Sequence, residues 1–276
     1  MLITTPQKES LILLESLSKI IWGIVLESVQ SFERLVYVCV FLASGEQREI
    51  LLIDLCSGSG NVVPMNSYSD KALVNRVASR LPEGERFLKA IESIDRHNER
   101  DPKRVSNDGV DMGYEFHFSC LLFVKVLSLR EDASEALLIA ARSQHICRWE
   151  SPRSDYPEGR AGYLKWRADL KRFHADKTES ILAELGYPPE FIETVRAINL
   201  KKDLKSNPDS QTMEDALCLV FLESQFPDFR VKTSEEKMVS IIRKTWAKMS
   251  AEGQKAALNL NLRDEEARLV GLALKG

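Results

Sequence analysis

The chain has 276 residues, enough for one large domain or two small ones, and 44% of them are hydrophobic, as is ordinary for a globular protein. Its 38 basic and 41 acidic residues leave a net charge of −3, which gives no reason to expect nucleic-acid binding. The five cysteines are scattered and form no CxxC pair, which argues against both a disulfide framework and a structural zinc site. These counts favour a reducing, intracellular compartment.

Residues 1–82 differ in character from the rest and are expected to form an atypical, poorly ordered N-terminal extension. The apolar run Leu11–Val29 is interrupted by charged residues, and Leu35–Ala43 is only about half as long as a membrane span. Neither run predicts a transmembrane helix, and no basic segment with a cleavage signature predicts a signal peptide. We therefore expect a cytoplasmic protein without a membrane partner, with organelle targeting by the extension as the alternative.

Within this extension, the segment Glu49–Val62 (EILLIDLCSGSGNV) resembles the cofactor loop of class I methyltransferases, because a strand-like run precedes a Gly-Ser-Gly turn. Pro64 interrupts the helix that should follow, and no acidic strand end appears about 20 residues further on. The alternating strands of such a fold are also missing downstream. A methyltransferase is therefore a remote alternative, beside a simple strand or hydrophobic turn.

From about Glu83 onward the apolar residues recur at helical spacing, which predicts an all-α fold for residues 83–276. Asp132 and Glu135 have the spacing of a helix cap, and Gly186 is a typical helix stop. The charged segment Asn98–Gly109 is expected to be a loop. The expected helices include one that carries Phe87, Leu88, Ile91 and Ile94, followed by helices over about 132–149, 160–185, 188–200, 212–225, 233–249 and 263–274.

Two of these helices carry histidines beside basic residues. The first places His145 and Arg148 at its C-terminal end, where they either cap the last carbonyl groups or face a site. On the second, Arg167, Lys171 and His174 share one face at spacings of i, i+4 and i+7. That face is either a solvated basic surface or the wall of a binding site.

A third helix opens with Glu214 and Asp215, whose carboxylates suit the positive end of a helix dipole. Taken together, however, two histidines and a carboxylate on three apolar helices are a ligand set for a divalent metal ion. We therefore predict a metal site at His145, His174 and Asp215.

Basic residues are concentrated around the two histidines. Residues 142–172 contain eight basic and four acidic side chains, a local net charge of +4 (8 − 4). Because arginine binds phosphate in a bidentate manner, the expected partner is a phosphorylated small molecule or a nucleotide. The side chains predicted to bind it are Arg148, Arg153, Arg160, Arg167 and Lys201.

The order of these segments is similar to that of a known superfamily. LLIAARSQHICRW, RFHADKTESILAELGYPPEFIETVRAINLKK and TMEDALCLVFLE resemble the HD phosphohydrolase superfamily, in which histidines and aspartates hold metal ions inside a helical domain. More closely, the stretch from about Arg86 to Leu269, above all ARSQHICRWESPRSDYPEGRAGYLKWRADLKRFHA, resembles the uncharacterised domain-of-unknown-function family 4202. The resemblance implies a single multi-helix, HD-like domain.

By this resemblance, His145, His174 and Asp215 are the catalytic residues, and the divalent metal would activate a water molecule. His117 would supply the first histidine of the pattern, or else it is a partly buried histidine of YEFHFSC. Ile146 stands where the superfamily has the aspartate of its His-Asp doublet, which removes a metal ligand. Two hypotheses therefore remain: a metal-dependent phosphohydrolase, or a non-catalytic nucleotide- or phosphate-binding module.

Overall fold

The computed structural model describes residues 37–44, 47–54, 62–64, 71–107 and 109–275. The chain divides into two compact units, residues 1–67 and 68–276. Each unit is described by itself.

The smaller unit contains an antiparallel sheet with the strand order β1-β2-β3, formed by Tyr37–Ser44, Gln47–Asp54 and Val62–Pro64. β2 is antiparallel to both of its neighbours, whereas the cofactor loop of a class I methyltransferase follows a strand of a parallel βαβ unit. Where the helix after that loop should begin, the chain forms β3. The Gly-Ser-Gly turn itself lies outside the described residues.

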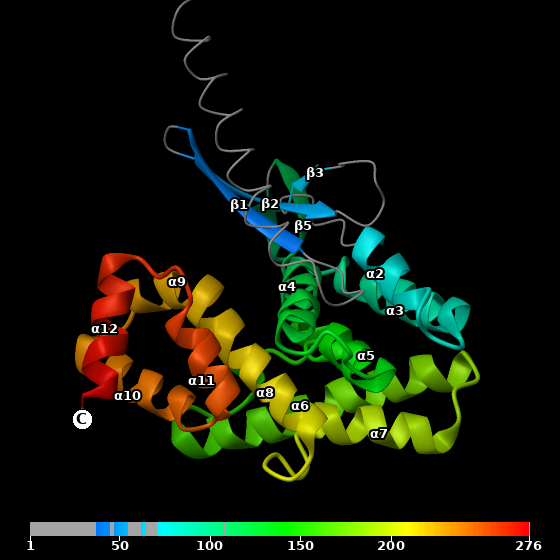
Figure 1. Cartoon of the computed structure of the whole chain (residues 1–276). Helices are drawn as coiled ribbons and strands as arrows, with labels where there is room; N and C mark the ends of the chain where they lie inside the picture. The colour runs from blue at the N-terminus through cyan, green and yellow to red at the C-terminus, as the bar shows by residue number, and fades with distance from the viewer. Residues whose placement is uncertain (1–36, 45–46, 55–61, 65–70, 108, 276) are drawn as a thin grey trace, which may run out of the picture. The chain divides into compact units, whose positions relative to one another are not determined.

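The larger unit is helical, which confirms the all-α prediction (Figure 1). It begins before residue 83, because α2 packs against α3. None of the described helices is long and apolar enough to cross a membrane. The helices are α2 (Lys71–Ala78), α3 (Gly84–Asn98), α4 (Tyr114–Leu129), α5 (Glu135–Ser143), α6 (Gly159–Glu184), α7 (Pro189–Leu200), α8 (Pro208–Val220), α9 (Phe226–Val231), α10 (Glu235–Trp246), α11 (Ala251–Leu258) and α12 (Asp264–Leu274), with short 3-10 helices at Arg148–Glu150 and Arg153–Asp155 and a π-helix, η3, at Phe221–Gln225.

The predicted loop at Asn98–Gly109 is wrong in its second half. β4 (Arg104–Asn107) and β5 (Val110–Gly113) form a hairpin there. Gly109 has a φ of +79°, which favours glycine in so tight a turn. The strands are too short and too polar to show a clear alternation of apolar residues, and this explains why the sequence did not reveal them.

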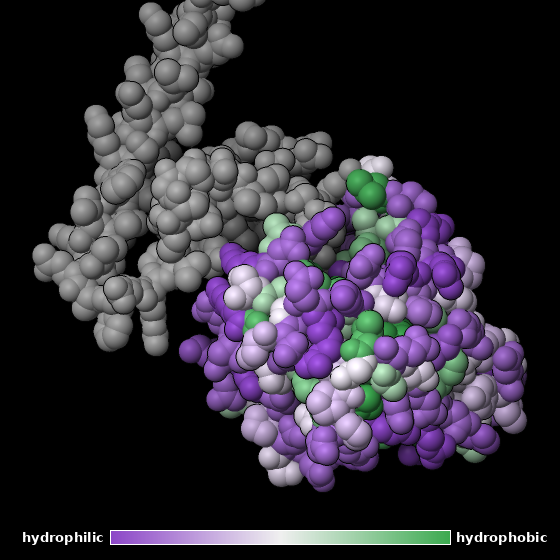
Figure 2. All heavy atoms as spheres, turned by 90° about the vertical axis from the view of Figure 1, so that its right-hand side faces the viewer, coloured by the Kyte–Doolittle hydropathy of each residue, from purple (hydrophilic) through white to green (hydrophobic). Residues whose placement is uncertain are grey.

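Two hydrophobic clusters form the core of the helical unit. The larger one surrounds α5, which is buried from Ala136 to Ser143 because its residues are apolar on nearly all sides. The smaller one joins the C-terminal helices, with Leu222, Phe226 and Met238 among its members. α8 contributes residues to both clusters and contacts α4, α5, α7 and α11. On the face shown in Figure 2, hydrophilic residues cover most of this unit and apolar patches are small.

The end of α5 positions the first histidine. The predicted helix through Trp149 instead ends at Ser143, after which Cys147 adopts a left-handed conformation with a φ of +52°. Asn98 of α3 holds this turn, because its Nδ2 donates to the carbonyl of Arg142 (3.3 Å) and its Oδ1 accepts from the amide of Cys147 (3.2 Å). The chain thereby turns His145 toward α4 and α6.

Candidate functional site

A cavity of about 400 Å³ lies among α4, α6, α8, η3, α9 and α10. This volume falls within the range of about 300–1,000 Å³ that is common for small-molecule sites. Both predicted histidines line the cavity, together with Gln144 and several apolar and aromatic side chains. Its charged lining residues are Arg148, Arg167, Lys171, Lys201, Lys248 and Glu214.

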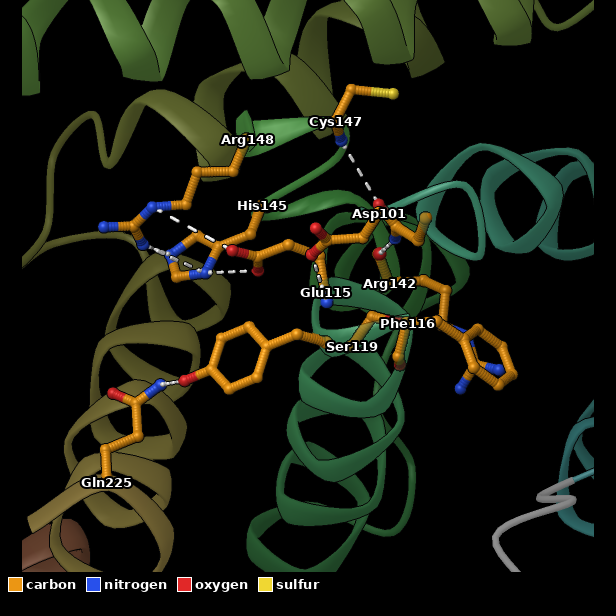
Figure 3. Close-up of polar contacts among 11 residues, drawn as sticks. Asp101, Glu115, Phe116, Ser119, Arg142, His145, Cys147, Arg148 and Gln225 are labelled. Atoms are coloured by element: carbon orange, nitrogen blue, oxygen red, sulfur yellow. Dashed lines mark hydrogen bonds and ion pairs between the residues drawn. The ribbon is translucent and has the colours of Figure 1, made fainter. Parts of the chain in front are cut away.

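His145 is held between an acidic and a basic side chain (Figure 3). Its Nδ1 lies 3.3 Å from Oε2 of Glu115, and Nη1 of Arg148 lies 3.4 and 3.3 Å from its two ring nitrogens. The imidazole stacks on Phe118 with ring centroids 4.2 Å apart. Burial, together with the charge of Arg148, lowers the pKa of His145 well below its usual value. His145 is therefore neutral at neutral pH.

His174 is 1% exposed and projects from α6, with its ring centroid 5.7 Å from that of His145. Burial, assisted by His145 and Arg148, lowers the pKa of His174 well below its usual value. Among the described residues, neither of its ring nitrogens has a hydrogen-bond partner. A buried polar group without a partner costs about 1–3 kcal/mol. His174 therefore offers a donor and an acceptor that a bound molecule would satisfy.

Glu115 titrates close to neutrality. Burial raises its pKa to about 7, although Arg148 and Lys103 oppose the shift. Between the ordinary value of 4.5 and about 7, the folded chain keeps a proton that the unfolded chain has released, so this group stabilises the fold less as pH rises through that window.

We therefore predict that Glu115→Gln removes this contribution. The free energy of unfolding of the wild type, minus that of the variant, should fall as pH rises from 4.5 to about 7. Urea denaturation of both proteins at a series of pH values measures the difference. A difference that stays constant over this range would show that Glu115 has an ordinary pKa.

A carboxylate and two lysines lie at one end of the cavity. Nζ of Lys201 donates to Glu214, and Nζ of Lys248 lies 3.4 Å from the other oxygen of Glu214. Burial opposes ionisation of Glu214, but the two lysines outweigh it and lower its pKa. Burial lowers the pKa of Lys171, and the neighbouring charge of Arg167 adds to the shift. The cavity therefore contains crowded positive charge that Glu214 balances only in part.

Asp215, predicted to meet the two histidines, does not line the cavity. Its Oδ1 accepts from the amide of Ser250 (2.8 Å) and from Gln211 Nε2 (2.9 Å), and its Oδ2 accepts from the Ser250 hydroxyl (2.5 Å). Its carboxyl carbon would lie 2.6 Å from a Cβ added at Gly253, so it packs directly against α11. Successive helical residues are about 100° apart, so Glu214 and Asp215 face different sides. Asp215 was predicted to be a metal ligand, but its side chain holds α11 in place.

The other predicted residues are divided between the cavity and other surroundings. Three of the predicted binding residues, Arg148, Arg167 and Lys201, line the cavity. Arg153 does not, because its guanidinium donates to the carbonyls of Tyr156 (2.8 Å) and Pro157 (2.8 Å). Arg160 is exposed at the start of α6, and the half-buried His117 lies on α4; neither is a lining residue.

Several important residues were missed by the sequence-based prediction. Lys171 was placed on the correct helix face but was not named as a binding residue, although its i+4 spacing from Arg167 was the signal. Of the adjacent carboxylates Glu214 and Asp215, the sequence pointed to Asp215 as the site residue, whereas Glu214 is the one that lines the cavity. Glu115 lies two residues before His117 but 30 residues before His145 (145 − 115), and Lys248 lies 74 residues after His174 (248 − 174). No spacing connects either residue to the site.

These side chains do not fit a divalent metal ion. Within the part of the chain that the structure describes, no group of three His, Cys, Asp or Glu side chains is arranged to hold one. The nearest carboxylates are Glu214, which is paired with lysines, and Glu115, which is paired with His145. An added cation would also face the positive charges of the cavity. The same charges fit an anion.

Comparison with known proteins identifies the family of the chain. A family model described as a domain of unknown function (DUF4202) matches residues 88–270. The chain belongs to this family. The DUF4202 region covers most of the helical unit and includes all the lining residues of the cavity. No curated protein and no solved structure matches the chain.

Proposed function

We propose that the DUF4202 region binds a phosphate-bearing small molecule in the cavity at His145 and His174. One observation carries the proposal: among the described residues, five basic side chains and one carboxylate line this cavity, and both imidazoles are neutral. The net charge is +4 (5 − 1), and it falls to +3 when Glu115, which lies beside Arg148, is ionised. Like charges in a partly buried space repel one another, and a bound anion relieves that repulsion.

The kinds of side chain also favour phosphate over a carboxylate ligand. Arg167 and Arg148 supply planar guanidinium groups that bind two oxygens at once, and Lys171 and Lys201 supply point charges. His174 adds a neutral imidazole whose N–H lacks a partner among the described residues. A phosphate group has enough oxygens to accept from several of these donors together.

The test is ligand-induced stabilisation at constant ionic strength, with inorganic phosphate, pyrophosphate and adenosine monophosphate as probes. A ligand present at 100 times its Kd stabilises the fold by about 2.7 kcal/mol. We expect the wild type to be stabilised, with or without a chelator, and Arg167→Gln to respond much less. Arg172→Gln is the matched control, since Arg172 is exposed on the same helix and pairs with Asp169. No response to any probe, or an equal response of Arg167→Gln, would contradict the proposal.

Glu214 gives a further prediction, because it occupies two of the lysines that a phosphate would use. Glu214→Gln should lower the stability of the free protein, since the buried Lys201 loses its partner charge. It should also increase the stabilisation by pyrophosphate, because the phosphate no longer competes with a carboxylate. Thermal unfolding with and without pyrophosphate measures both effects. A smaller ligand response in the variant would mean that Glu214 itself contacts the ligand.

Hydrolysis of the bound phosphoester is a second candidate, favoured by the neutral, unpartnered imidazole of His174. In that reaction a water oxygen bonds to phosphorus, the ester P–O bond breaks, His174 takes the proton of the water, and the leaving oxygen takes a proton from the solvent. Release of phosphate from p-nitrophenyl phosphate by the wild type, reduced at least tenfold in His174→Gln, is the expected result. If p-nitrophenyl phosphate binds but no phosphate is released, the region binds phosphate compounds without hydrolysing them.

A further inference from the structure

The lining of the cavity changes in character from one end to the other. On α8 and η3, Glu214 is followed seven residues later by Phe221. On α10 and the turn after it, Ile241 precedes Lys248, also by seven residues. A helix rises 1.5 Å per residue, so Glu214 and Phe221 are separated by about 10 Å along α8.

On each of these two segments, one end of the cavity lining is charged and the other end is apolar. Lys248 is the residue that pairs with Glu214, so the charged ends of both segments meet. Phe221 and Ile241 each lie seven residues from this charged pair, and both pack against the smaller hydrophobic cluster. α6 agrees with this order: Lys171 interacts with Glu214 and Lys248 at the charged end, whereas Tyr163 lies eight residues earlier.

Aromatic rings also line the cavity. Phe221 packs edge-on against Phe229, with ring centroids 6.2 Å apart, and Tyr163 lies 5.9 Å from Trp166. Phe229 and Tyr163 are 44% and 47% exposed although both line the cavity, so their faces are accessible to a ligand. Phe221 also begins the π-helix η3, a distortion that often occurs at functional sites.

We infer that the ligand is a phosphate ester that also carries a separate flat aromatic ring, with its phosphate among Arg167, Lys171 and Lys201 and the ring against Phe221 about 10 Å away. This inference rests on the proposed function and names its ligand class. A nucleoside monophosphate belongs to this class, whereas inorganic phosphate and short aliphatic phosphates fill only the charged end. An aromatic ring stacks favourably on exposed aromatic side chains.

Calorimetric titration with two phosphonates tests the inference, because the C–P bond is not hydrolysed. Methylphosphonate presents the head group alone, and 4-(2-naphthyl)butylphosphonate presents the same head with a flat ring at the end of a four-carbon chain that can reach Phe221. We expect the naphthyl compound to bind at least tenfold more tightly to the wild type. Phe221→Ala should remove this advantage and leave the Kd of methylphosphonate unchanged.

Ile241→Ala is a second, milder variant in case Phe221→Ala does not fold, and Leu258→Ala, exposed on α11, is the matched control. Equal affinity for the two phosphonates, or a naphthyl advantage that survives in both cavity variants, would overturn the inference while the proposed function stands. Failure of both compounds to bind would overturn the proposed function itself.

Discussion

Replacing Arg167 and Lys171 together by glutamine should weaken the binding of pyrophosphate by about a hundredfold or more. A hydrogen bond to a charged group contributes about 1.5–3 kcal/mol, and each 1.4 kcal/mol is a factor of ten in Kd. Both side chains lie on the same face of α6 and line the cavity, so the variant loses two such interactions at once. Calorimetric titration gives the Kd of both proteins.

The same variant should fold as well as the wild type. Neither side chain is fully buried, and the positive charge of Arg167 adds to the lowering of the pKa of Lys171, which shows that the two charges repel. Their removal therefore relieves repulsion in the free protein. Lys165→Gln combined with Arg172→Gln is the control, since these residues pair with Asp169 on the exposed side of α6. Equal loss of affinity in the control would mean that the effect is long-range charge and not contact.

Replacing Asp215 by alanine should lower the free energy of unfolding by about 3 kcal/mol, because the amide and hydroxyl of Ser250 both lose their hydrogen-bond acceptor. It also frees the Ser250 side chain that caps α11 by accepting from the amide of Gly253 (3.0 Å). The affinity for pyrophosphate, in contrast, should not change, since Asp215 does not line the cavity. Urea denaturation and calorimetry provide the two numbers.

Ser250→Ala serves as the control for this prediction. If Asp215 acts through Ser250, the two single substitutions are not additive, and the double variant should be scarcely less stable than Asp215→Ala. Loss of pyrophosphate binding in Asp215→Ala, with stability retained, would return Asp215 to the role of a site residue that the sequence suggested.

The helices that the sequence predicted correctly are those whose signals are local. α6 follows from an unbroken helical period, and its end follows from Gly186, which has a φ of +72°. The predicted helix over residues 132–149 ended too late because the decisive contact is not local. Asn98 precedes Cys147 by 49 residues, and its side chain fixes the turn after α5.

In the site, too, the residues that the sequence predicted correctly are those with local signals. The shared face of Arg167, Lys171 and His174 was predictable from their spacing on one helix, and all three line the cavity. Which of the adjacent Glu214 and Asp215 enters the cavity depends on how α8 is rotated against α11, and no local pattern records that rotation. Glu115 comes beside His145 through the packing of α4 on α5, which joins segments 30 residues apart (145 − 115).

The most direct test of the phosphate site is the NMR signal of the histidine side chains during a titration with pyrophosphate. The chain contains four histidines, so each imidazole can be assigned by single substitution. The ring nitrogens of His174 should shift strongly in the wild type and in Arg172→Gln, those of His145 should shift less because Glu115 and Arg148 hold that ring, and those of His97 and His117 should not move. Binding of pyrophosphate that leaves the His174 signals unchanged would contradict the assignment of this cavity as the phosphate site.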